Sequence, residues 1–222
     1  MAVDIGPATV AAAPGEDDIG FAAICEHRRV RVVLVAVGYL LGTFPSAILV
    51  ARANGVDIAS FGSGNPGASN VTRALGWRKG LWVYALDALK GALATGLGLW
   101  LDGRPLAYLC GAAAITGHMF PVFRHFRGGK GVATGSGALV VLHPVLALVL
   151  APTWWLVSRV TGTAAVASIV AVVLVPVGLA AGGAPAWEFA ATAGVCLLIV
   201  VKHWDNVVRI LRREEHRLSR TP

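Results

Sequence analysis

The chain has 222 residues, of which 56% are hydrophobic and only 14% are charged. Soluble globular domains carry about 25% charged residues, so this composition excludes an ordinary soluble domain and favours a helical membrane protein. In a chain this apolar, positive loops facing anionic lipid headgroups explain the formal net charge of +7 better than nucleic acid does.

The N-terminal region, residues 1–29, is rich in Ala, Gly and Pro, and we expect it to form a flexible tail. A transmembrane domain over 30–201 and a basic C-terminal segment over 202–222 would follow it. The stretches 32–51 and 163–183 contain no charged residue, and each is long enough to cross roughly 30 Å of hydrocarbon as a helix. The apolar stretches are 32–51, 80–101, 105–121, 132–157, 163–183 and 187–201.

Lysine and arginine between the apolar stretches predict the orientation. Segment 52–79 holds four of these residues, segment 122–131 holds three, and the tail after residue 201 holds six. The positive-inside rule places all three segments in the cytoplasm. Six crossings would leave the C-terminus outside, but seven would not, and proline in His143-Pro144 breaks the stretch 132–157 into two short helices. We therefore expect an all-α bundle of about seven helices, some short or re-entrant, with the N-terminus outside and the C-terminus cytoplasmic.

The first polar segment, "FGSGNPGASNVTR" at residues 61–73, has the composition of an anion-binding loop. Glycines let the backbone approach a ligand closely, and successive N–H groups in such a turn form an anion-binding nest. Ser63, Ser69 and Thr72 add hydroxyl donors, and Arg73 offers a bidentate fork for phosphate. An ordinary glycine-rich connecting loop is the alternative interpretation, because the same residues mark turns generally.

Asp87 and Lys90 lie inside the apolar stretch 80–101 and are three residues apart, so they can pair on one helical face. Charges within a membrane span are costly unless they are paired or face a wet cavity. A structural ion pair is one interpretation. In the other, Lys90 reaches a substrate site from within the bundle.

The second polar segment, "GHMFPVFRHFRGGKG" at residues 117–131, ends at the start of a predicted helix. Its "GGKG" offers bare backbone amides, a helix N-terminus and a cation together, and we expect Lys130 to bind phosphate. His118 lies near the end of an apolar stretch, where an ionisable residue is a functional candidate. Arg124 and Arg127 are better explained by topology and headgroup contact.

The third polar segment, "KHWDNVVR", begins the basic tail. On one continuous helix, Lys202, Asn206 and Arg209 would share a face, and so would His203 and Asn206. A simple amphipathic helix next to the membrane is the alternative. The sequence contains no evident catalytic triad and no metal motif such as HExxH, so positioning and charge neutralisation are the favoured chemistry.

Five stretches in order resemble the bacterial acyl-phosphate:glycerol-3-phosphate acyltransferase family. They are "YLLGTFPSAILVAR", "DIASFGSGNPGASNVTRALG", "DALKG", "GHMFPVFRHFRGGKGVATGSGAL" and "KHWDNVVRIL". The resemblance implies a seven-helix enzyme of the bacterial inner membrane with its active site at the cytoplasmic face. It implies transfer of an acyl group from acyl phosphate to glycerol 3-phosphate, giving lysophosphatidic acid and inorganic phosphate. It also implies that no metal, cofactor, coenzyme A or acyl carrier protein is required, and that a substrate phosphate oxygen takes the hydroxyl proton.

The same resemblance implies roles for individual residues. The catalytic residues would be Ser63, Arg73, Lys130, His203 and Asn206. A larger group of glycines, amides and cations would bind the substrates: Gly62, Gly64, Asn65, Gly67, Ser69, Asn70, Lys90, His118, Gly128, Gly129, Gly131 and Lys202.

The sequence departs from the family pattern at a few positions. Ala59 replaces an arginine, Ser69 replaces a threonine and keeps its hydroxyl, and Arg213 replaces a glycine that precedes a glutamate. Two other classes of protein are alternatives. A transporter for phosphorylated metabolites would contain similar anion sites but should have internal repeats, none of which is convincing here. A non-catalytic lipid-binding protein would need no glycerol 3-phosphate pocket.

Overall fold

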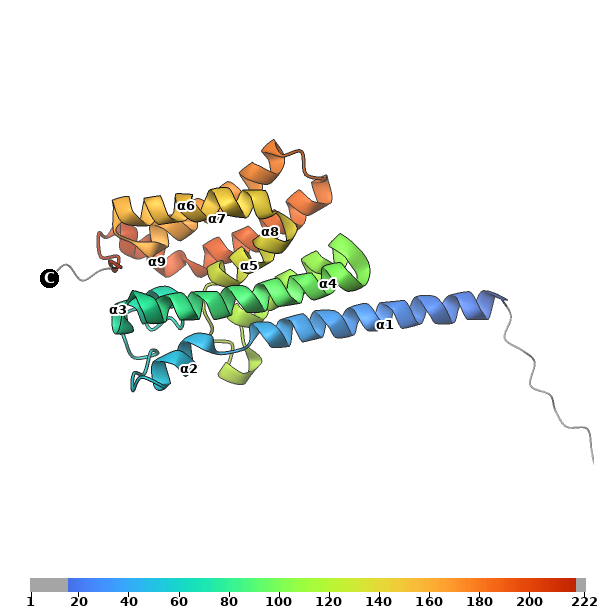
Figure 1. Ribbon diagram of the computed structural model, residues 1–222, viewed down its shortest axis with the longest axis horizontal. Helices are drawn as coiled ribbons and strands as arrows, with labels where there is room; N and C mark the ends of the chain where they lie inside the picture. The colour runs from blue at the N-terminus through green and yellow to red at the C-terminus, as the bar shows by residue number, and fades with distance from the viewer. Residues whose placement is uncertain (1–15, 219–222) are drawn as a thin grey trace, which may run out of the picture. The chain divides into compact units, whose positions relative to one another are not determined.

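The structure is a computed structural model that describes residues 16–218, and all the regular secondary structure in this range is helical (Figure 1). The helices are α1 (Glu16–Gly42), α2 (Ser46–Arg52), α3 (Ala68–Leu75), α4 (Trp77–Met119), the short 3₁₀ helix η1 (Val122–Arg124), α5 (Val132–Leu142), α6 (Pro144–Thr161), α7 (Ala164–Ala181), α8 (Ala186–Lys202) and α9 (Trp204–Leu211).

Helix α1 begins at Glu16, inside the segment that was expected to be a flexible tail. No proline lies between this residue and Phe44, so nothing in the sequence breaks the helix before the membrane-spanning part starts. The rest of the expected tail, residues 1–15, lies outside the described residues. The chain divides into two compact units, Met1–Val33 and Leu34–Pro222, and the domain boundaries expected from the sequence stay predictions.

Helix α4 is a helical hairpin and not one straight rod. Asp102 and Gly103 have non-helical backbone angles, and the chain reverses direction there (Figure 1). The two halves lie so close together that a Cβ at Gly98 would be 2.7 Å from the carbonyl oxygen of Leu106. The separate apolar stretches 80–101 and 105–121 predicted from the sequence are therefore confirmed as two helical segments.

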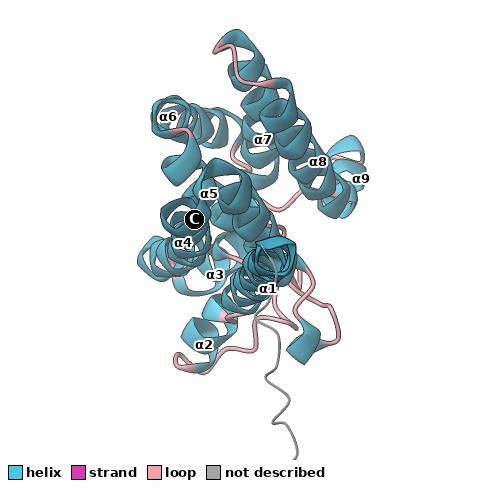
Figure 2. Cartoon of the chain, turned by 90° about the vertical axis from the view of Figure 1, so that its right-hand side faces the viewer, coloured by secondary structure: helices cyan, strands magenta, loops and turns pink. Residues whose placement is uncertain are grey.

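The predicted break at His143-Pro144 is also confirmed, because α5 ends at Leu142 and α6 begins at Pro144. Figure 2 shows α5 between α4 and α6. Glycine makes this close packing possible, since a Cβ at Gly137 would be 1.8 Å from the carbonyl oxygen of Ala88. Small residues at a helix interface let the two backbones approach each other, which is how membrane helices associate.

A cluster of polar side chains joins several helices at one end of the bundle. The Arg104 guanidinium forms two hydrogen bonds of 2.6 Å to the buried Glu188 carboxylate, and it also donates to the Leu142 carbonyl at 3.3 Å. The Tyr108 hydroxyl lies 2.9 Å from the same carboxylate and 2.6 Å from His143 Nε2. The turn of α4, the α5–α6 break and the start of α8 are thereby joined at this end.

The outer surface of the helices is apolar, as a lipid-facing surface must be. Trp100 is 80% exposed and Leu148 is 75% exposed, which would be costly in water. Among the described residues, four helices are long and apolar enough to cross a membrane, or five if α8 and α9 count as one broken span. In that count α4 is a single helix, and α5 is too short to be included. The number of seven crossings stays a prediction.

Candidate active site

Hydrogen bonds bring the three predicted polar segments together at one end of the bundle. The Lys130 ammonium in the second segment donates to the Asn206 side-chain oxygen in the third. Arg73 in the first segment donates from Nε to the Arg217 carbonyl at 3.1 Å. The chain after α9 therefore connects the first segment to the other two. The spacing of residues 73, 130 and 206 in the sequence does not indicate this proximity.

The first segment is organised around Asn70, which is buried on α3. Its amide nitrogen donates to the carbonyls of Ile58 and Phe61 at 3.3 and 2.8 Å. Its oxygen accepts from the Ser63 backbone at 3.3 Å and from Arg73 Nη1 at 3.4 Å. Because an amide side chain has two donor and two acceptor positions, all of them are used within the protein. Asn70 thus holds the loop and Arg73 in place, a different role from the substrate contact expected for it.

The other predicted residues of this segment form the turn before α3. Gly62 and Gly64 have positive φ angles of 56° and 65°, and Gly67 is the N-cap of α3. The Ser63 hydroxyl accepts a hydrogen bond from the Asn65 backbone at 3.4 Å. Ser69 follows in the first turn of the helix, where backbone N–H groups have no intrahelical partner.

The second segment folds back against the end of α4. The backbone N–H of Gly128 donates to the Met119 carbonyl at 3.2 Å, and that of Gly129 donates to the His118 carbonyl at 3.0 Å. The prediction that these two glycines present bare amides to a phosphate is therefore wrong, because the end of α4 already uses them. Both positions need glycine for another reason. A Cβ at Gly128 would be 2.0 Å from the His118 carbonyl oxygen, and a Cβ at Gly129 would be 2.1 Å from His118 Nε2.

Lys130 is the cation of this segment, and it stands just before Gly131, the N-cap of α5. Burial lowers the pKa of the Lys130 ammonium to about 8, and the nearby Arg209 guanidinium acts in the same direction. The Glu215 carboxylate opposes this change. The ammonium is thus partly withdrawn from water and has a neutral amide oxygen as its hydrogen-bond partner. An arriving anion would stabilise the charged form strongly in such an environment.

The third segment is bent, and this separates residues that the sequence placed on one face. Helices α8 and α9 meet at an angle of 54° at His203. Lys202 lies on the α8 side of the bend, with its ammonium 4.5 Å from the centre of the Phe120 ring. Asn206 lies on the α9 side, with Lys130. The prediction of a shared face for Lys202 and Asn206 is wrong because it assumed one continuous helix.

His203 is buried at the bend, and its Nδ1 lies 2.8 Å from the Ile199 carbonyl. A carbonyl oxygen can only accept, so Nδ1 carries the proton of this hydrogen bond. In the neutral ring, Nε2 then keeps a lone pair and can accept a hydrogen bond from another group.

Glu215 is a site residue that the sequence reasoning did not select. Its Oε2 accepts from Asn206 Nδ2 at 3.0 Å and from Arg209 Nε at 3.2 Å. Its other oxygen, Oε1, is buried without a partner among the described residues. The available signal was the glutamate of the family pattern, which Glu215 matches if no gap intervenes, within a tail rich in arginine. A pattern of this kind says nothing about which cations the carboxylate meets after the chain folds back.

Asp87 and Lys90 form the expected ion pair, with 2.8 Å between Lys90 Nζ and Asp87 Oδ1. The same Nζ lies 2.7 Å from His118 Nδ1, and the second interpretation, in which Lys90 reaches a substrate site, stays a prediction. Ser46, which the sequence reasoning missed, lies 2.5 Å from Asp87 Oδ1 through its hydroxyl.

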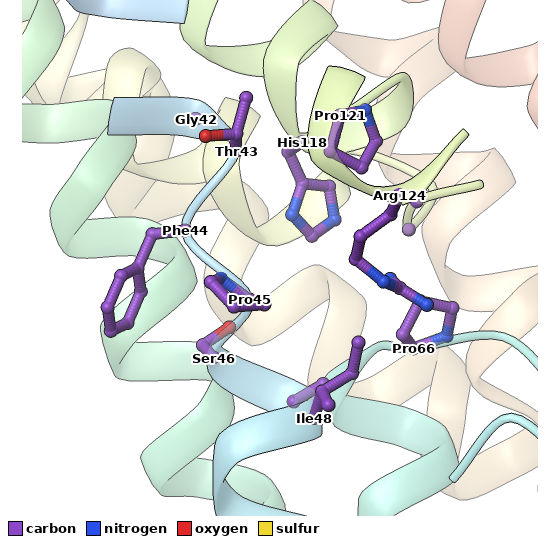
Figure 3. A pocket seen from close by; sticks show the side chains of 13 residues that line it. Gly42, Thr43, Phe44, Pro45, Ser46, Ile48, Pro66, His118, Pro121 and Arg124 are labelled. Carbon is purple, nitrogen blue, oxygen red and sulfur yellow. The ribbon is translucent and has the colours of Figure 1, made fainter. Parts of the chain in front are cut away.

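A small pocket and an adjoining groove lie beside these groups. A small pocket of about 20 Å³ is lined by His118 and Arg124, by Pro66 of the first segment, and by Gly128 and Gly129 of the second (Figure 3). A much larger groove of about 700 Å³ runs between the end of α1 and α4. The groove is almost entirely apolar, and it shares its head with the small pocket through a few common residues: Thr43, Phe44, Pro45 and Arg124.

Comparison with known proteins gives one consistent family. The model of the glycerol-3-phosphate acyltransferase family matches residues 32–213. A glycerol-3-phosphate acyltransferase from Thermus thermophilus is 42% identical over 191 residues, which cover 82% of this chain and 92% of the relative. One from Legionella pneumophila is 40% identical over 190 residues, covering 85% of this chain and 69% of the relative.

Solved structures agree with the sequence relatives. The crystal structure of PlsY, an integral membrane glycerol 3-phosphate acyltransferase in its glycerol 3-phosphate form, superposes with a TM-score of 0.81 at 36% identity. The match covers 85% of this chain and 95% of that one. A lysophosphatidic acid form of the same protein superposes with a TM-score of 0.79. This chain is therefore a polytopic membrane enzyme that belongs to the glycerol-3-phosphate acyltransferase family.

Proposed function

We propose that this enzyme transfers a fatty acyl group from an acyl phosphate to the 1-hydroxyl of glycerol 3-phosphate. The products are lysophosphatidic acid and inorganic phosphate, and the reaction is the first step of phospholipid synthesis. Neither coenzyme A nor acyl carrier protein is needed as the donor. The enzyme acts in the bacterial inner membrane, at its cytoplasmic face.

The observation that carries the proposal is the position of the anion-binding groups relative to the apolar groove. The loops that hold Arg73 and Lys130 both line the small pocket at the head of the groove, through Pro66 and through Gly128 and Gly129. An acyl phosphate has a long apolar chain that ends in an anion, and glycerol 3-phosphate brings a second anion. An apolar groove that ends between two cationic loops suits this pair of substrates.

The chemistry requires little from the protein beyond positioning and charge. The 1-hydroxyl oxygen attacks the carbonyl carbon of the acyl phosphate, and a carbon–oxygen bond forms. The bond between that carbon and the bridging phosphate oxygen breaks, and phosphate leaves with the electron pair. A phosphate oxygen of the substrate takes the hydroxyl proton. Arg73 and Lys130 hold the phosphates, while His203 and Asn206 orient the acceptor.

Family membership decides against the transporter considered from the sequence, because the family is one of acyltransferases. It equally decides against a non-catalytic lipid-binding protein. Family membership alone does not identify acyl phosphate as the donor, a substrate phosphate oxygen as the proton acceptor, or the roles of the residues.

The test is phosphate release by the purified protein, supplied with palmitoyl phosphate in the presence and absence of glycerol 3-phosphate. We expect release that depends on the acceptor, with an equal amount of lysophosphatidic acid. Arg73→Ala and Lys130→Ala should each reduce turnover by at least 100-fold while the protein stays folded in detergent. Truncation of one partner of a buried, hydrogen-bonded charge pair typically costs about 2–5 kcal/mol, and a cost in this range allows a 100-fold loss of turnover.

Arg127→Ala is the matched control, because Arg127 is an exposed cation three residues before Lys130 and lines neither the pocket nor the groove. It should keep turnover within a factor of two. Equal rates with palmitoyl-coenzyme A would refute acyl phosphate as the specific donor. Near-normal turnover in both alanine variants would refute the role given to the two cationic loops.

A further inference from the structure

Beneath the small pocket lies a chain of buried polar groups that the proposed mechanism does not use. Ser46, Asp87, Lys90 and His118 come from α2 and the two halves of α4, and none of them is more than 8% exposed. Burial of four polar side chains in a membrane protein is costly, so their arrangement calls for a physical reason.

The hydrogen bonds of Lys90 determine where the proton of His118 lies. A lysine ammonium has three protons to donate and cannot accept. Nζ of Lys90 has three acceptors: Asp87 Oδ1 at 2.8 Å, the Phe44 carbonyl at 3.1 Å and His118 Nδ1 at 2.7 Å. Nδ1 must therefore offer its lone pair to the ammonium. A neutral imidazole has one protonated nitrogen, so the proton of His118 lies on Nε2.

The alternative arrangement is sterically and electrostatically unfavourable. A proton on Nδ1 would point at the ammonium protons only 2.7 Å away, whereas the Asp87 carboxylate that could accept it is 3.5 Å from Nδ1. The Ser46 hydroxyl donates to that same carboxylate oxygen and helps to fix it in place. Ser46 thus fixes the carboxylate of the ion pair, and the Phe44 carbonyl fixes its ammonium. The ammonium in turn fixes the orientation of the histidine ring.

Nε2 of His118 is at the edge of the ring that faces the second polar segment. Nε2 packs against Gly129, since a Cβ at that position would be 2.1 Å from it. In Figure 3 the His118 ring points into the pocket, which Arg124 also lines. A volume of about 20 Å³ holds roughly one oxygen-sized group. This space opens at the head of the apolar groove.

We infer that the Asp87–Lys90 pair is a positioning device that fixes His118 as a neutral Nε2–H donor to a phosphoryl oxygen of the acyl phosphate. This inference rests on the proposed function for the identity of the donor substrate. Negative charge grows on the leaving phosphate as the carbon–oxygen bond breaks, and a donor that is already oriented stabilises this charge without reorganisation. In this scheme Lys90 and Asp87 act on the phosphoryl group only through His118, although Lys90 also lines the apolar groove, and Ser46 supports the pair.

The first test needs no substrate. Nitrogen-15 NMR of the detergent-solubilised protein with labelled histidine distinguishes a protonated nitrogen from one with a lone pair, and loss of one signal set in His118→Gln gives the assignment. We expect Nε2 protonated and Nδ1 unprotonated at neutral pH. Lys90→Met in combination with Asp87→Asn removes both charges of the pair, and should yield a mixture of the two tautomers.

The second test is kinetic. Glutamine places an amide nitrogen near the position of Nε2, whereas asparagine places it near Nδ1. His118→Gln should therefore keep kcat within about 10-fold of the wild type, and His118→Asn should lose at least 100-fold at an unchanged KM for glycerol 3-phosphate. His125→Gln is the matched control, since His125 is exposed on the same segment and should leave the rates unaltered.

Failure of the inference and failure of the proposed function are distinguishable. A proton on Nδ1, or a doubly protonated ring, would overturn the inference even if acyl transfer from palmitoyl phosphate is normal. Equal losses in His118→Gln and His118→Asn would leave the tautomer but remove the contact with the phosphoryl oxygen, and so would also overturn it. Absence of acyl transfer with the expected tautomer present would instead count against the proposed function.

Discussion

At the scale of single residues, the cations of the site differ in how their charge is held. Arg73 remains charged at any accessible pH even though burial lowers its pKa, because guanidinium does not lose its proton in proteins. Lys130 is different, because burial lowers its pKa to about 8. The lysine can therefore lose its charge within the range in which the enzyme is assayed.

This difference predicts the pH dependence of kcat/KM for glycerol 3-phosphate. Below pH 8 Lys130 is charged and can bind phosphate, and above this pH it becomes neutral in the free enzyme. The phosphate of the substrate loses its second proton at a pH of about 6. We expect kcat/KM to be highest between these values and to fall tenfold per pH unit well above pH 8. Lys130→Arg should remove the alkaline decline, whatever its effect on the maximum rate, and a decline that persists in this variant would assign it to another group.

The family resemblance, together with the polar segments that interrupt an apolar chain, allowed the sequence to select Arg73, Lys130, His203 and Asn206. It could not indicate how their partners are used. Asn70 was expected to face a substrate, but its amide satisfies the loop itself. The amides of Gly128 and Gly129 were expected to be bare, but they bind the end of α4. Such assignments depend on contacts between distant residues, which no local pattern records.

At the scale of elements, breaks in helices were predictable where the chain chemistry marks them. Proline at residue 144 and the short polar stretch at 102–104 indicated the ends of apolar helices, and both breaks are present. The start of α1 at Glu16 and the bend at His203 were not predicted. Pro14 and Gly15 stand directly before Glu16, but the overall composition of residues 1–29 favoured a tail. The bend carries no proline or glycine signal, and it places His203 in a buried position that only tertiary packing can define.

The end of α9 contains an element-scale departure from the family pattern that has a measurable cost. The backbone N–H of Arg213 donates to the Ile210 carbonyl at 3.0 Å, and the backbone N–H of Glu214 donates to the Arg209 carbonyl at 2.8 Å. These are the two hydrogen bonds of a Schellman motif, in which the residue with positive φ is usually glycine. Here the residue is arginine at φ 61°, and it occupies the position at which the resemblance expects a glycine.

Arg213→Gly should therefore stabilise the protein. A left-handed backbone costs a residue with a side chain about 1–2 kcal/mol, part of which glycine returns through its larger freedom in the unfolded chain. We expect a gain of about 1 kcal/mol, seen as a rise of about 2–4 °C in the midpoint of thermal unfolding in detergent. Arg212→Gly is the control, because this neighbouring arginine has φ −82° and should gain nothing. A similar rise in both variants would mean that lost charge repulsion, and not backbone strain, is the cause.

At the scale of the whole molecule, two groups of contacts define two opposite ends. Arg104 links the turn of α4 to the α5–α6 break and to the start of α8. At the other end, Arg73 contacts the chain after α9, and Leu218 of that segment donates to the Gly162 carbonyl between α6 and α7 at 2.9 Å. The α6–α7 connection therefore lies with the polar loops. An arrangement of this kind requires α5 and α6 to run in opposite directions between the two ends.

This arrangement supports the seven-crossing topology that the positive charges predict. Helix α5 has 11 residues, which span about 16 Å as an α-helix and fall short of a full bilayer, so the bilayer must be thin or the hairpin partly buried there. If the polar loops are cytoplasmic, the Arg104 end faces outward. The excess of lysine and arginine near the polar loops then agrees with the positive-inside rule.

Cysteine accessibility tests this topology. In a background without the native Cys25, Cys110 and Cys196, single cysteines are introduced by Ser60→Cys, Arg212→Cys or Ala186→Cys, all at exposed positions. A membrane-impermeant thiol reagent should label only Ala186→Cys in cells with an intact inner membrane, and should label all three after permeabilisation. Because Arg212 and Ala186 flank α8 and α9, labelling of both in intact cells would mean that α8 does not cross. Labelling of Ser60→Cys and Arg212→Cys alone would reverse the orientation and place the active site outside, where the cell does not supply acyl phosphate or glycerol 3-phosphate.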